Sequence, residues 1–302
     1  MKKIKSTLSF IGLGKLGLAL QASFASKKFD TLGYDINYNL VKKIKEGNED
    51  HQEKGVQNII QNNKKFKVTL NLHDIFNESK ITFVTLPTPS LNNGKFSLKY
   101  LYNFFQSLKN YKDVIKKNKQ IIIIVSTINP GDMSEKISIY LSNLLNLKYN
   151  QDFFLIYNPE FIALGSVLRD LFNTDFVLIG SENNRKSLLL KSIYLKFYGK
   201  NFIDKIFTMS SLDAEISKIA FNAFTTMKIT FANQIGLLAK KNSKINPNNI
   251  LSCIGTSKRV SNYYFKKGIP YAGPCFPRDN LAYAKFFKSY SIKMKFLYKL
   301  TE

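Results

Sequence analysis

The glycine-rich segment at residues 12–17, Gly-Leu-Gly-Lys-Leu-Gly, constrains the fold of this chain more than any other feature. It follows the apolar run Thr7–Gly12, which is typical of a strand, and it opens a helical stretch at residues 15–27. Glycines in this pattern permit a tight turn, a close approach of the backbone to a pyrophosphate at the helix N-terminus, and close packing of the helix on the strand. The segment therefore predicts a dinucleotide-binding turn, with a plain tight turn as the alternative. The expected cofactor contacts in it are Gly12, Gly14, Leu16 and Gly17.

An acidic residue follows this turn at the distance that dinucleotide recognition requires. Asp35 ends the next predicted strand, Thr31–Asp35, eighteen residues beyond Gly17. A carboxylate at this place binds the ribose 2′-hydroxyl and repels a 2′-phosphate. We therefore predict NAD as the cofactor in preference to NADP.

Short β-rich runs alternate with helical stretches between residues 7 and 180. The run Ile121–Val125 is apolar on both faces, as a central parallel strand requires. The further strands expected are Ile81–Leu86, Gln120–Ser126, Phe153–Tyr157 and Phe176–Ile179, with helices at 37–46, 97–109 and 132–145. This alternation predicts an α/β fold that begins with a Rossmann-like, doubly wound parallel sheet.

The pattern becomes helical after about residue 200. Apolar residues recur at three- and four-residue spacing from Ser211 to Lys241, which predicts one long helix with Asp213 and Glu215 at its start. A shorter helix near 247–254, a Gly/Pro loop at 268–279 and a last helix from residue 280 complete this part. We predict an NAD-binding Rossmann-like domain over residues 1–200 and an all-helical central domain over residues 201–302.

Composition limits the kinds of partner. The net charge is +24, but only four of the 45 basic residues are arginine, and the lysines are scattered with no stripe or tail. This distribution argues against a specific nucleic-acid role and leaves anionic small molecules within reach. The sequence has no run of eighteen apolar residues that would span a membrane. Two cysteines and two histidines provide neither a disulfide framework nor a metal cluster, which favours a reducing, cytoplasmic setting.

Polar motifs follow the predicted strands, where ligands bind in open α/β sheets. They are Leu86-Pro-Thr-Pro89, Ser126-Thr-Ile-Asn-Pro-Gly131 and Asn158-Pro-Glu-Phe161, and each alone could be a proline-stiffened loop. A further motif, Tyr271–Asp279, places Cys275 between two prolines with an acid four residues later. This is an unusual setting for a packing cysteine. Cys253, in an apolar helix, is expected to be an inert packing residue.

Taken in order, these motifs resemble those of the UDP-glucose/GDP-mannose dehydrogenase family. The Gly-rich turn, Pro-Thr-Pro, Ser-Thr-x-x-Pro-Gly, Asn-Pro-Glu-Phe, Glu-x-x-Lys-x-x-x-Asn-Ala-Phe and Cys-Phe-Pro-Arg-Asp occur between residues 7 and about 285. The resemblance implies a four-electron oxidation of a nucleotide sugar's C6 alcohol to the uronic acid, using NAD and no metal. It also implies a role in polysaccharide biosynthesis and a homodimer formed through the helical domain.

The resemblance assigns a role to each site residue. Cys275 matches the nucleophile, which forms a thiohemiacetal and then a thioester. Lys218 matches the lysine that steadies the oxyanion, with Asn222 one turn further along the helix. The residues that match those positioning and deprotonating water are Asp279, Glu160 and Thr127. Further cofactor contacts are Pro87, Thr88, Thr127 and Arg278, and the substrate contacts are Glu160, Phe161, Lys218, Asn222, Gly273 and Arg259, the last across a dimer interface.

The chain departs from the family pattern in three places. Leu164 stands where a second glutamate is common, and Pro274, which has no backbone N–H, precedes the cysteine in place of serine. Family members also continue into a C-terminal domain that grips the nucleotide, whereas this sequence stops at Glu302. These departures leave open a catalytically impaired NAD-binding remnant that acts as a dimer-forming or regulatory module. A β-hydroxyacid dehydrogenase is a further alternative, against which the cysteine loop argues.

Overall fold

The computed structural model describes residues 7–48, 53, 55–163, 165–268, 270, 271, 273 and 275–293. The chain forms two compact units. Unit 1 comprises Met1–Pro89 and Ser97–Glu215, and unit 2 comprises Ser90–Phe96 and Ile216–Glu302. The short stretch Ser90–Phe96 therefore belongs to a different unit from the residues that flank it.

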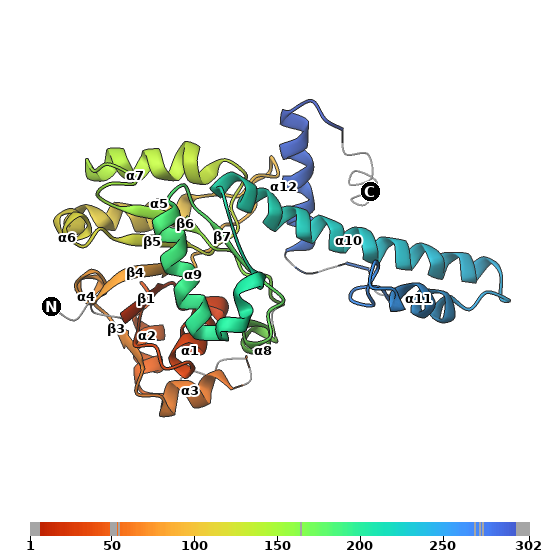
Figure 1. Ribbon diagram of the computed structural model, residues 1–302, viewed down its shortest axis with the longest axis horizontal. Coiled ribbons are helices and arrows are strands. Elements are labelled where there is room, and N and C mark those ends of the chain that lie inside the picture. The colour runs from red at the N-terminus through yellow and green to blue at the C-terminus, as the bar shows by residue number, and fades with distance from the viewer. Residues whose placement is uncertain are drawn as a thin grey trace. The chain divides into compact units, whose positions relative to one another are not determined.

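An eight-stranded sheet forms the centre of unit 1 (Figure 1). Its strands lie in the order β3-β2-β1-β4-β5-β6-β7-β8, and all neighbours are parallel except β6 and β7. The strands are β1 (Thr7–Ile11), β2 (Thr31–Tyr34), β3 (Phe66–Thr69), β4 (Ser79–Val84), β5 (Ile121–Ile124), β6 (Phe154–Tyr157), β7 (Val177–Gly180) and β8 (Ile206–Met209). The strand order reverses between β1 and β4, which is the switch point where such sheets bind ligands. The predicted doubly wound parallel fold is confirmed.

Helices cover both faces of the sheet (Figure 1). One face packs against α1 (Lys15–Ser26), α2 (Tyr38–Lys45), α3 (Val56–Asn62), α8 (Val167–Phe172) and α9 (Asn184–Tyr198). The other packs against α4 (Leu72–Glu78), α5 (Lys99–Ser107), α6 (Lys112–Asn118) and α7 (Ser138–Leu145). Three short helical segments complete the unit: η1 (Leu108–Tyr111), the π-helix η2 (Asp132–Ile137) and η3 (Lys200–Lys205).

The central strand β5 shows why the sheet needs helices on both faces. All four of its isoleucines are buried. Ile121 and Ile123 join the apolar cluster on one face, whereas Ile122 and Ile124 join the cluster on the other. A strand without polar alternation thus buries both of its faces, as a parallel sheet between two helical layers demands.

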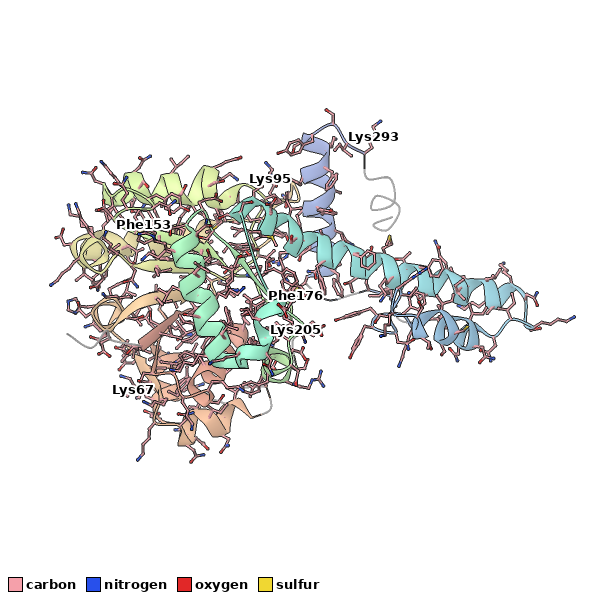
Figure 2. The ribbon with its side chains drawn as sticks, viewed as in Figure 1. Lys67, Lys95, Phe153, Phe176, Lys205 and Lys293 are labelled. Atoms are coloured by element: carbon pink, nitrogen blue, oxygen red, sulfur yellow. The ribbon has the colours of Figure 1, made fainter. Side chains whose placement is uncertain are left out.

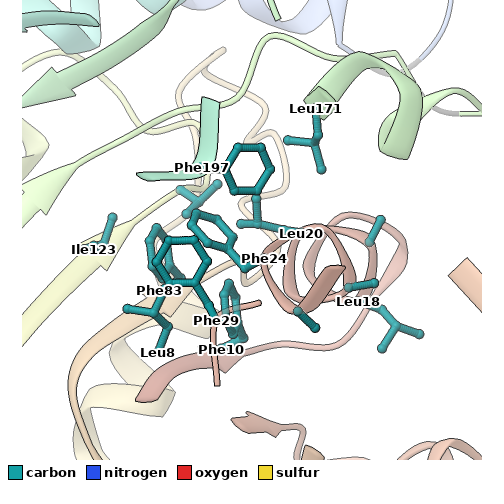
Figure 3. Close-up of a cluster of buried hydrophobic side chains, with 14 of the residues drawn as sticks. Leu8, Phe10, Leu18, Leu20, Phe24, Phe29, Phe83, Ile123, Leu171 and Phe197 are labelled. Carbon is teal, nitrogen blue, oxygen red and sulfur yellow. The ribbon is translucent and has the colours of Figure 1, made fainter. Parts of the chain in front are cut away.

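A group of phenylalanines fixes α1 on the sheet (Figure 3). Phe10 of β1 stacks on Phe83 of β4 with ring centroids 5.1 Å apart. Phe24 of α1 lies 5.4 Å from the Phe83 ring and 4.9 Å from the Phe197 ring of α9. Truncating a buried phenylalanine to alanine typically costs about 3–5 kcal/mol. This packing therefore holds the C-terminal half of α1 against the sheet.

Unit 2 is built from helices. The 31-residue helix α10 (Ser211–Lys241) begins in the last residues of unit 1 and continues through unit 2, and its predicted bounds are confirmed. It is followed by α11 (Pro247–Thr256) and α12 (Phe276–Ser289). The start predicted for the last helix is wrong, because α12 begins four residues earlier, with Cys275 as its N-cap. Pro277 lies in the first turn, where a missing N–H costs nothing.

The sequence pattern also missed several elements. β3 and β8 were not predicted, and neither were α3, α4, α6, α8 and α9. In β3 and β8 only the end residues Phe66, Thr69 and Ile206 are buried, and a polar residue, Lys67 or Thr208, interrupts the apolar run of each strand. Among the described residues, no helix is long and apolar enough to cross a bilayer. Lys67 of the edge strand β3 and Lys205 of η3, both labelled in Figure 2, are exposed.

Candidate functional site

The glycine-rich turn connects β1 to α1 and depends on two of its glycines. Gly12 has a φ of +88°, and a Cβ there would lie 3.2 Å from the carbonyl oxygen of Thr85. A Cβ on Gly17 would collide with the Gly12 carbonyl oxygen and the Thr85 hydroxyl. Gly14 is the N-cap of α1 and faces open space. The backbone therefore leaves the positive end of α1 free to receive a phosphate.

Asp35 is fixed beside this turn. Its Oδ2 accepts a hydrogen bond from the Leu13 backbone N–H at 2.7 Å, and its Oδ1 accepts one from the Asn37 N–H at 2.8 Å. A carboxylate oxygen has further lone pairs, so both oxygens can still accept from ribose hydroxyls. The residues present thus fit an NAD ribose at the end of β2, next to the turn that would hold its pyrophosphate.

The loops after β4 and β5 are tied to each other at the same edge of the sheet. The Ser126 hydroxyl donates to the Leu86 carbonyl at 2.5 Å, and the Thr88 hydroxyl donates to the Thr127 carbonyl at 2.6 Å. Thr88 is buried, Thr127 is half-buried and Pro87 is exposed. The structure thus brings these three predicted cofactor contacts together, one strand away from the glycine-rich turn.

Glu215 is a site residue whose place the sequence did not reveal. Its fully buried carboxylate accepts hydrogen bonds from the backbone N–H groups of Gly131 at 2.6 Å and Met133 at 2.8 Å. It therefore caps η2, the segment that follows the Ser126–Gly131 motif, although the sequence had suggested only a favourable charge at the start of its own helix. Burial raises the pKa of Glu215 to about 8; the nearby Asp132 and Glu135 add to the effect, and the two backbone donors oppose it.

The Asn-Pro-Glu-Phe loop after β6 is anchored by its asparagine. The Asn158 amide donates to the Leu178 carbonyl at 2.8 Å and accepts from the Tyr194 hydroxyl at 2.5 Å. Glu160 is half-buried. Burial of the Tyr194 hydroxyl raises the pKa of Tyr194, and the charge of Glu160 raises it further. Phe161 packs its ring 4.7 Å from that of Phe176, which Figure 2 labels.

A second buried glutamate secures the far end of this loop. Glu53 is 2% exposed and accepts hydrogen bonds from the N–H groups of Gly165 at 2.6 Å and Val167 at 2.8 Å. It thereby caps α8 from a residue more than one hundred positions earlier in the chain. No local pattern marks Glu53, because its partners are backbone groups of a distant segment. Leu164, where a carboxylate is common in the family pattern, lies outside the described residues.

A buried polar cluster joins α10 and α12 within unit 2. Asp279 is 1% exposed and accepts a hydrogen bond from the Asn222 amide at 2.6 Å and one from the Arg278 guanidinium at 3.2 Å. Lys218 lies one turn before Asn222 on α10 and is only 8% exposed. Lys218 is therefore not a solvated surface lysine. The Arg278 guanidinium also lies over the Phe96 ring, 4.7 Å from its centroid.

Cys275 lies at the start of α12, one turn from this cluster. Its carbonyl accepts a hydrogen bond from the Asp279 N–H at 2.9 Å, and its side chain is exposed. The Cys275 side chain makes no capping hydrogen bond, and the positive end of α12 lies beside its sulfur. Cys253 lies in a helix as predicted, but its expected packing role is wrong, because it too is exposed.

The remaining predicted residues lie in loops of unit 2. Gly273 has a φ of +83°, which favours glycine. Arg259 is exposed in the turn after α11. Pro274 lies outside the described residues, so the prediction about its missing N–H concerns a position that the structure does not describe.

Within unit 1 the structure places Thr127 and Glu160 after adjacent strands, and within unit 2 it gathers Lys218, Asn222 and Asp279. Nowhere in the described part of the chain do three histidine, cysteine or acidic side chains form a metal-ligand group.

Two family models match nearly the whole chain. Residues 6–198 match the NAD binding domain of the UDP-glucose/GDP-mannose dehydrogenase family, and residues 212–302 match the central domain of the same family. The chain belongs to this family. The match to the NAD binding domain accordingly indicates NAD as the cofactor.

Individual relatives agree with this assignment. UDP-glucose 6-dehydrogenase AglM of Haloferax volcanii is 24% identical over 91% of this chain and 64% of its own length. An uncharacterized protein of Methanocaldococcus jannaschii is 30% identical over 91% of this chain and 30% of its own length. The solved structure of a UDP-glucose dehydrogenase from Pyrobaculum islandicum superposes with a TM-score of 0.84 at 26% identity, over 98% of this chain and 68% of that one. The chain spans less than two thirds of the length of these two curated relatives.

Proposed function

We propose that this chain acts as an NAD-dependent nucleotide-sugar 6-dehydrogenase, which oxidises the C6 alcohol of a UDP-glucose-like substrate to the uronic acid. The observation that supports it most is the arrangement in unit 2. An exposed cysteine at a helix N-terminus lies one turn from a buried Asn222–Asp279 pair, with the buried Lys218 one turn along α10. A chain that needed only to bind NAD would have no use for this group.

Cys275 is the proposed nucleophile. NAD+ held by the glycine-rich turn and Asp35 would supply the hydride acceptor, with a fresh NAD+ molecule for each of the two oxidations. Between them the Cys275 sulfur adds to the aldehyde carbon, which forms a C–S bond and a thiohemiacetal; the hydroxyl of the thiohemiacetal carries the former thiol proton, which is lost when the second hydride leaves. After the second hydride has left, the carbon is a thioester. Attack by water then breaks the C–S bond, releases the acid and restores the thiol, so that one difficult oxidation is divided into easier stages.

Lys218 and Asn222 are proposed to stabilise the negative oxygen that develops in these steps. A buried ammonium interacts with such a charge more strongly than an exposed one, because less water screens it. Asn222 is held by its hydrogen bond to Asp279, so its position is fixed before the substrate binds. Lys218 and Asn222 are four residues apart and lie on one face of α10, so both side chains can reach the same oxygen.

Carboxylates are proposed to handle the proton of the hydrolytic water. The two acids proposed for this role are Asp279 and Glu160, since general acid–base chemistry suits a carboxylate. Thr127 is proposed to help position the water, and all three residues are assigned by their match to the family motif. Phe161, Gly273 and Arg259 are the further proposed substrate contacts, and Arg278 is a proposed cofactor contact. We also propose the functional division into an NAD-binding domain over residues 1–200 and a central domain over residues 201–302.

A homodimer through the helical domain is part of this proposal. Phe224, Phe231 and Leu238 follow one another at seven-residue spacing along α10, which places them on one face of the helix. They are 59%, 46% and 51% exposed. Large apolar side chains aligned in this way favour a protein partner over water, and a second copy of the chain is the proposed partner.

The nucleophile assignment can be tested with a matched pair of cysteine variants. Cys275→Ser should reduce uronic-acid formation by at least the order of 10³-fold, as is typical when a nucleophile is removed, while NAD binding persists. Cys253→Ser provides the control, because it removes the other exposed thiol of the described chain. The acid is measured by mass spectrometry. Equal acid formation by the two variants would contradict the assignment.

A further inference from the structure

A cavity of unit 1 lies at the edge of the sheet opposite the glycine-rich turn. It is formed where β1, β4 and β5 begin, whereas the turn follows the carboxyl end of β1. Its volume is about 630 Å³, within the range of small-molecule sites. Apolar side chains form much of its wall: Leu8, Phe29, Ile81, Ile121, Leu189 and Ile193.

Lysines supply most of the polar lining. Six of the sixteen lining residues are lysine, whereas lysine makes up 41 of the 302 residues of the chain. The six are Lys28, Lys80, Lys117, Lys119, Lys186 and Lys196. The acid in this lining is Asp30, and its Oδ1 is already paired with Lys65 at 2.7 Å. Within the described residues, none of the six lysines forms an ion pair.

Two of these lysines adopt a backbone conformation that lysine disfavours. Lys28 and Lys119 have φ values of +66° and +50°, and they follow α1 and α6. Glycine or asparagine usually occupies such a position after a helix, and another residue costs about 1–2 kcal/mol there. Strain of this kind gathers at ligand sites. Both helices thus end in a strained lysine that lines the same cavity.

The positive charge in the cavity is only partly offset by its surroundings: the Lys186 ammonium lies over the Phe154 ring at 4.1 Å, the Lys196 ammonium lies over the Phe29 ring at 4.5 Å, and Asp30 lines the cavity. Burial, and then the charges of Lys119 and Lys80, lower the pKa of Lys186. Lys186 also lies in the first turn of α9, at the positive end of that helix. The C-terminal ends of α1 and α6 supply only about half a negative charge each. These contributions are small against six ammonium groups, so an anion would relieve their mutual repulsion.

We propose that this cavity binds a small organic anion carrying two or more phosphate groups, at a site separate from the NAD turn. Ammonium groups bind phosphate as point charges and do not require a fixed planar geometry. The apolar wall would receive the organic part of the ligand. A confined cavity with one cluster of lysines fits a small solute better than a nucleic-acid backbone, which needs an extended basic stripe.

The test uses the 302-residue chain with its glycine-rich turn saturated by NAD+. Binding of inorganic tripolyphosphate and of adenosine triphosphate is measured by isothermal titration calorimetry at fixed ionic strength. The variant Lys80→Gln/Lys186→Gln removes two charges from the cavity. The control Lys64→Gln/Lys148→Gln removes two exposed charges of unit 1 that lie outside it.

The cavity variant should weaken binding of both probes by at least about tenfold, as the loss of charge-assisted contacts requires, while the control stays close to wild type. Adenosine triphosphate should bind more tightly than tripolyphosphate, because it alone reaches the apolar wall. Unchanged NAD affinity in all variants verifies that unit 1 is folded. Equal weakening in both variants would assign binding to the diffuse charge of the chain and overturn the proposal, as would the absence of binding to wild type.

Discussion

Replacing Glu215 with glutamine tests whether a buried carboxyl group links the stability of unit 1 to pH. Its pKa of about 8, against 4.5 for an ordinary glutamate, corresponds to at most about 5 kcal/mol at 1.36 kcal/mol per unit. Above pH 4.5 the unfolded chain loses this proton, whereas the folded chain keeps it until about pH 8. The contribution of Glu215 to the free energy of unfolding is therefore full below pH 4.5 and falls as pH rises to 8.

The glutamine variant should reverse this dependence. Glutamine cannot ionise, and its NH2 group faces one of the two backbone donors, Gly131 or Met133, so it loses one hydrogen bond at a cost of about 1–2 kcal/mol. Wild type should accordingly be the more stable protein at pH 5. The variant should be the more stable one at pH 8.5, because there the wild-type carboxylate must be ionised in a buried site.

Urea denaturation at pH 5, 6, 7 and 8.5 and constant ionic strength measures the two stability curves. Glu78→Gln is the matched control, because Glu78 is an exposed glutamate at the end of α4 in unit 1, and its charge is not among those that shift the pKa of Glu215. Its curve should run parallel to that of wild type. If the Glu215→Gln curve also ran parallel to wild type over this range, the assignment of a raised pKa to Glu215 would be refuted.

Three further variants test the cofactor site and the dimer. Asp35→Ala should weaken NAD binding by about tenfold and reduce the preference for NAD over NADP, because the carboxylate that binds the ribose hydroxyl is lost. Fluorescence titration with NADH and NADPH measures both affinities, and unchanged values would place the ribose elsewhere. Gly17→Ala should abolish NAD binding in the same titration, because its Cβ would meet the Gly12 carbonyl, and normal affinity would contradict the geometry of the turn. Phe224→Asp should convert the dimer to a monomer, as measured by light scattering. Leu188→Asp, at a similarly exposed position on α9, should leave the dimer intact. A dimer in both variants would exclude this face of α10 as the dimer interface.

The sequence predicted those parts of the molecule whose physical cause is local. The glycine-rich turn, the apolar run of β5 and the long periodic helix α10 are each specified by neighbouring residues, and all three were found where expected. The start of α12 was misplaced, because Pro277 was taken for a loop residue although proline is well tolerated in a first helical turn.

What the sequence did not predict depends on contacts between distant segments. Glu53 and Glu215 cap helices that lie more than eighty residues away, and their partners are backbone groups that leave no mark on the sequence. The same reason applies to Ser90–Phe96, which joins unit 2 by placing Phe96 beside Ile219 and Ala282. Pairings of this kind arise only when the whole chain is folded.

The most direct test of the proposed function is the number of NADH molecules released for each nucleotide sugar that this 302-residue chain consumes. Absorbance measures NADH and mass spectrometry measures the sugar, over a panel of UDP- and GDP-sugars. Two NADH per sugar are expected, with the uronic acid as product. One NADH per sugar would contradict the thioester route through Cys275, and the absence of turnover by a chain that still binds NAD would contradict the proposed activity itself.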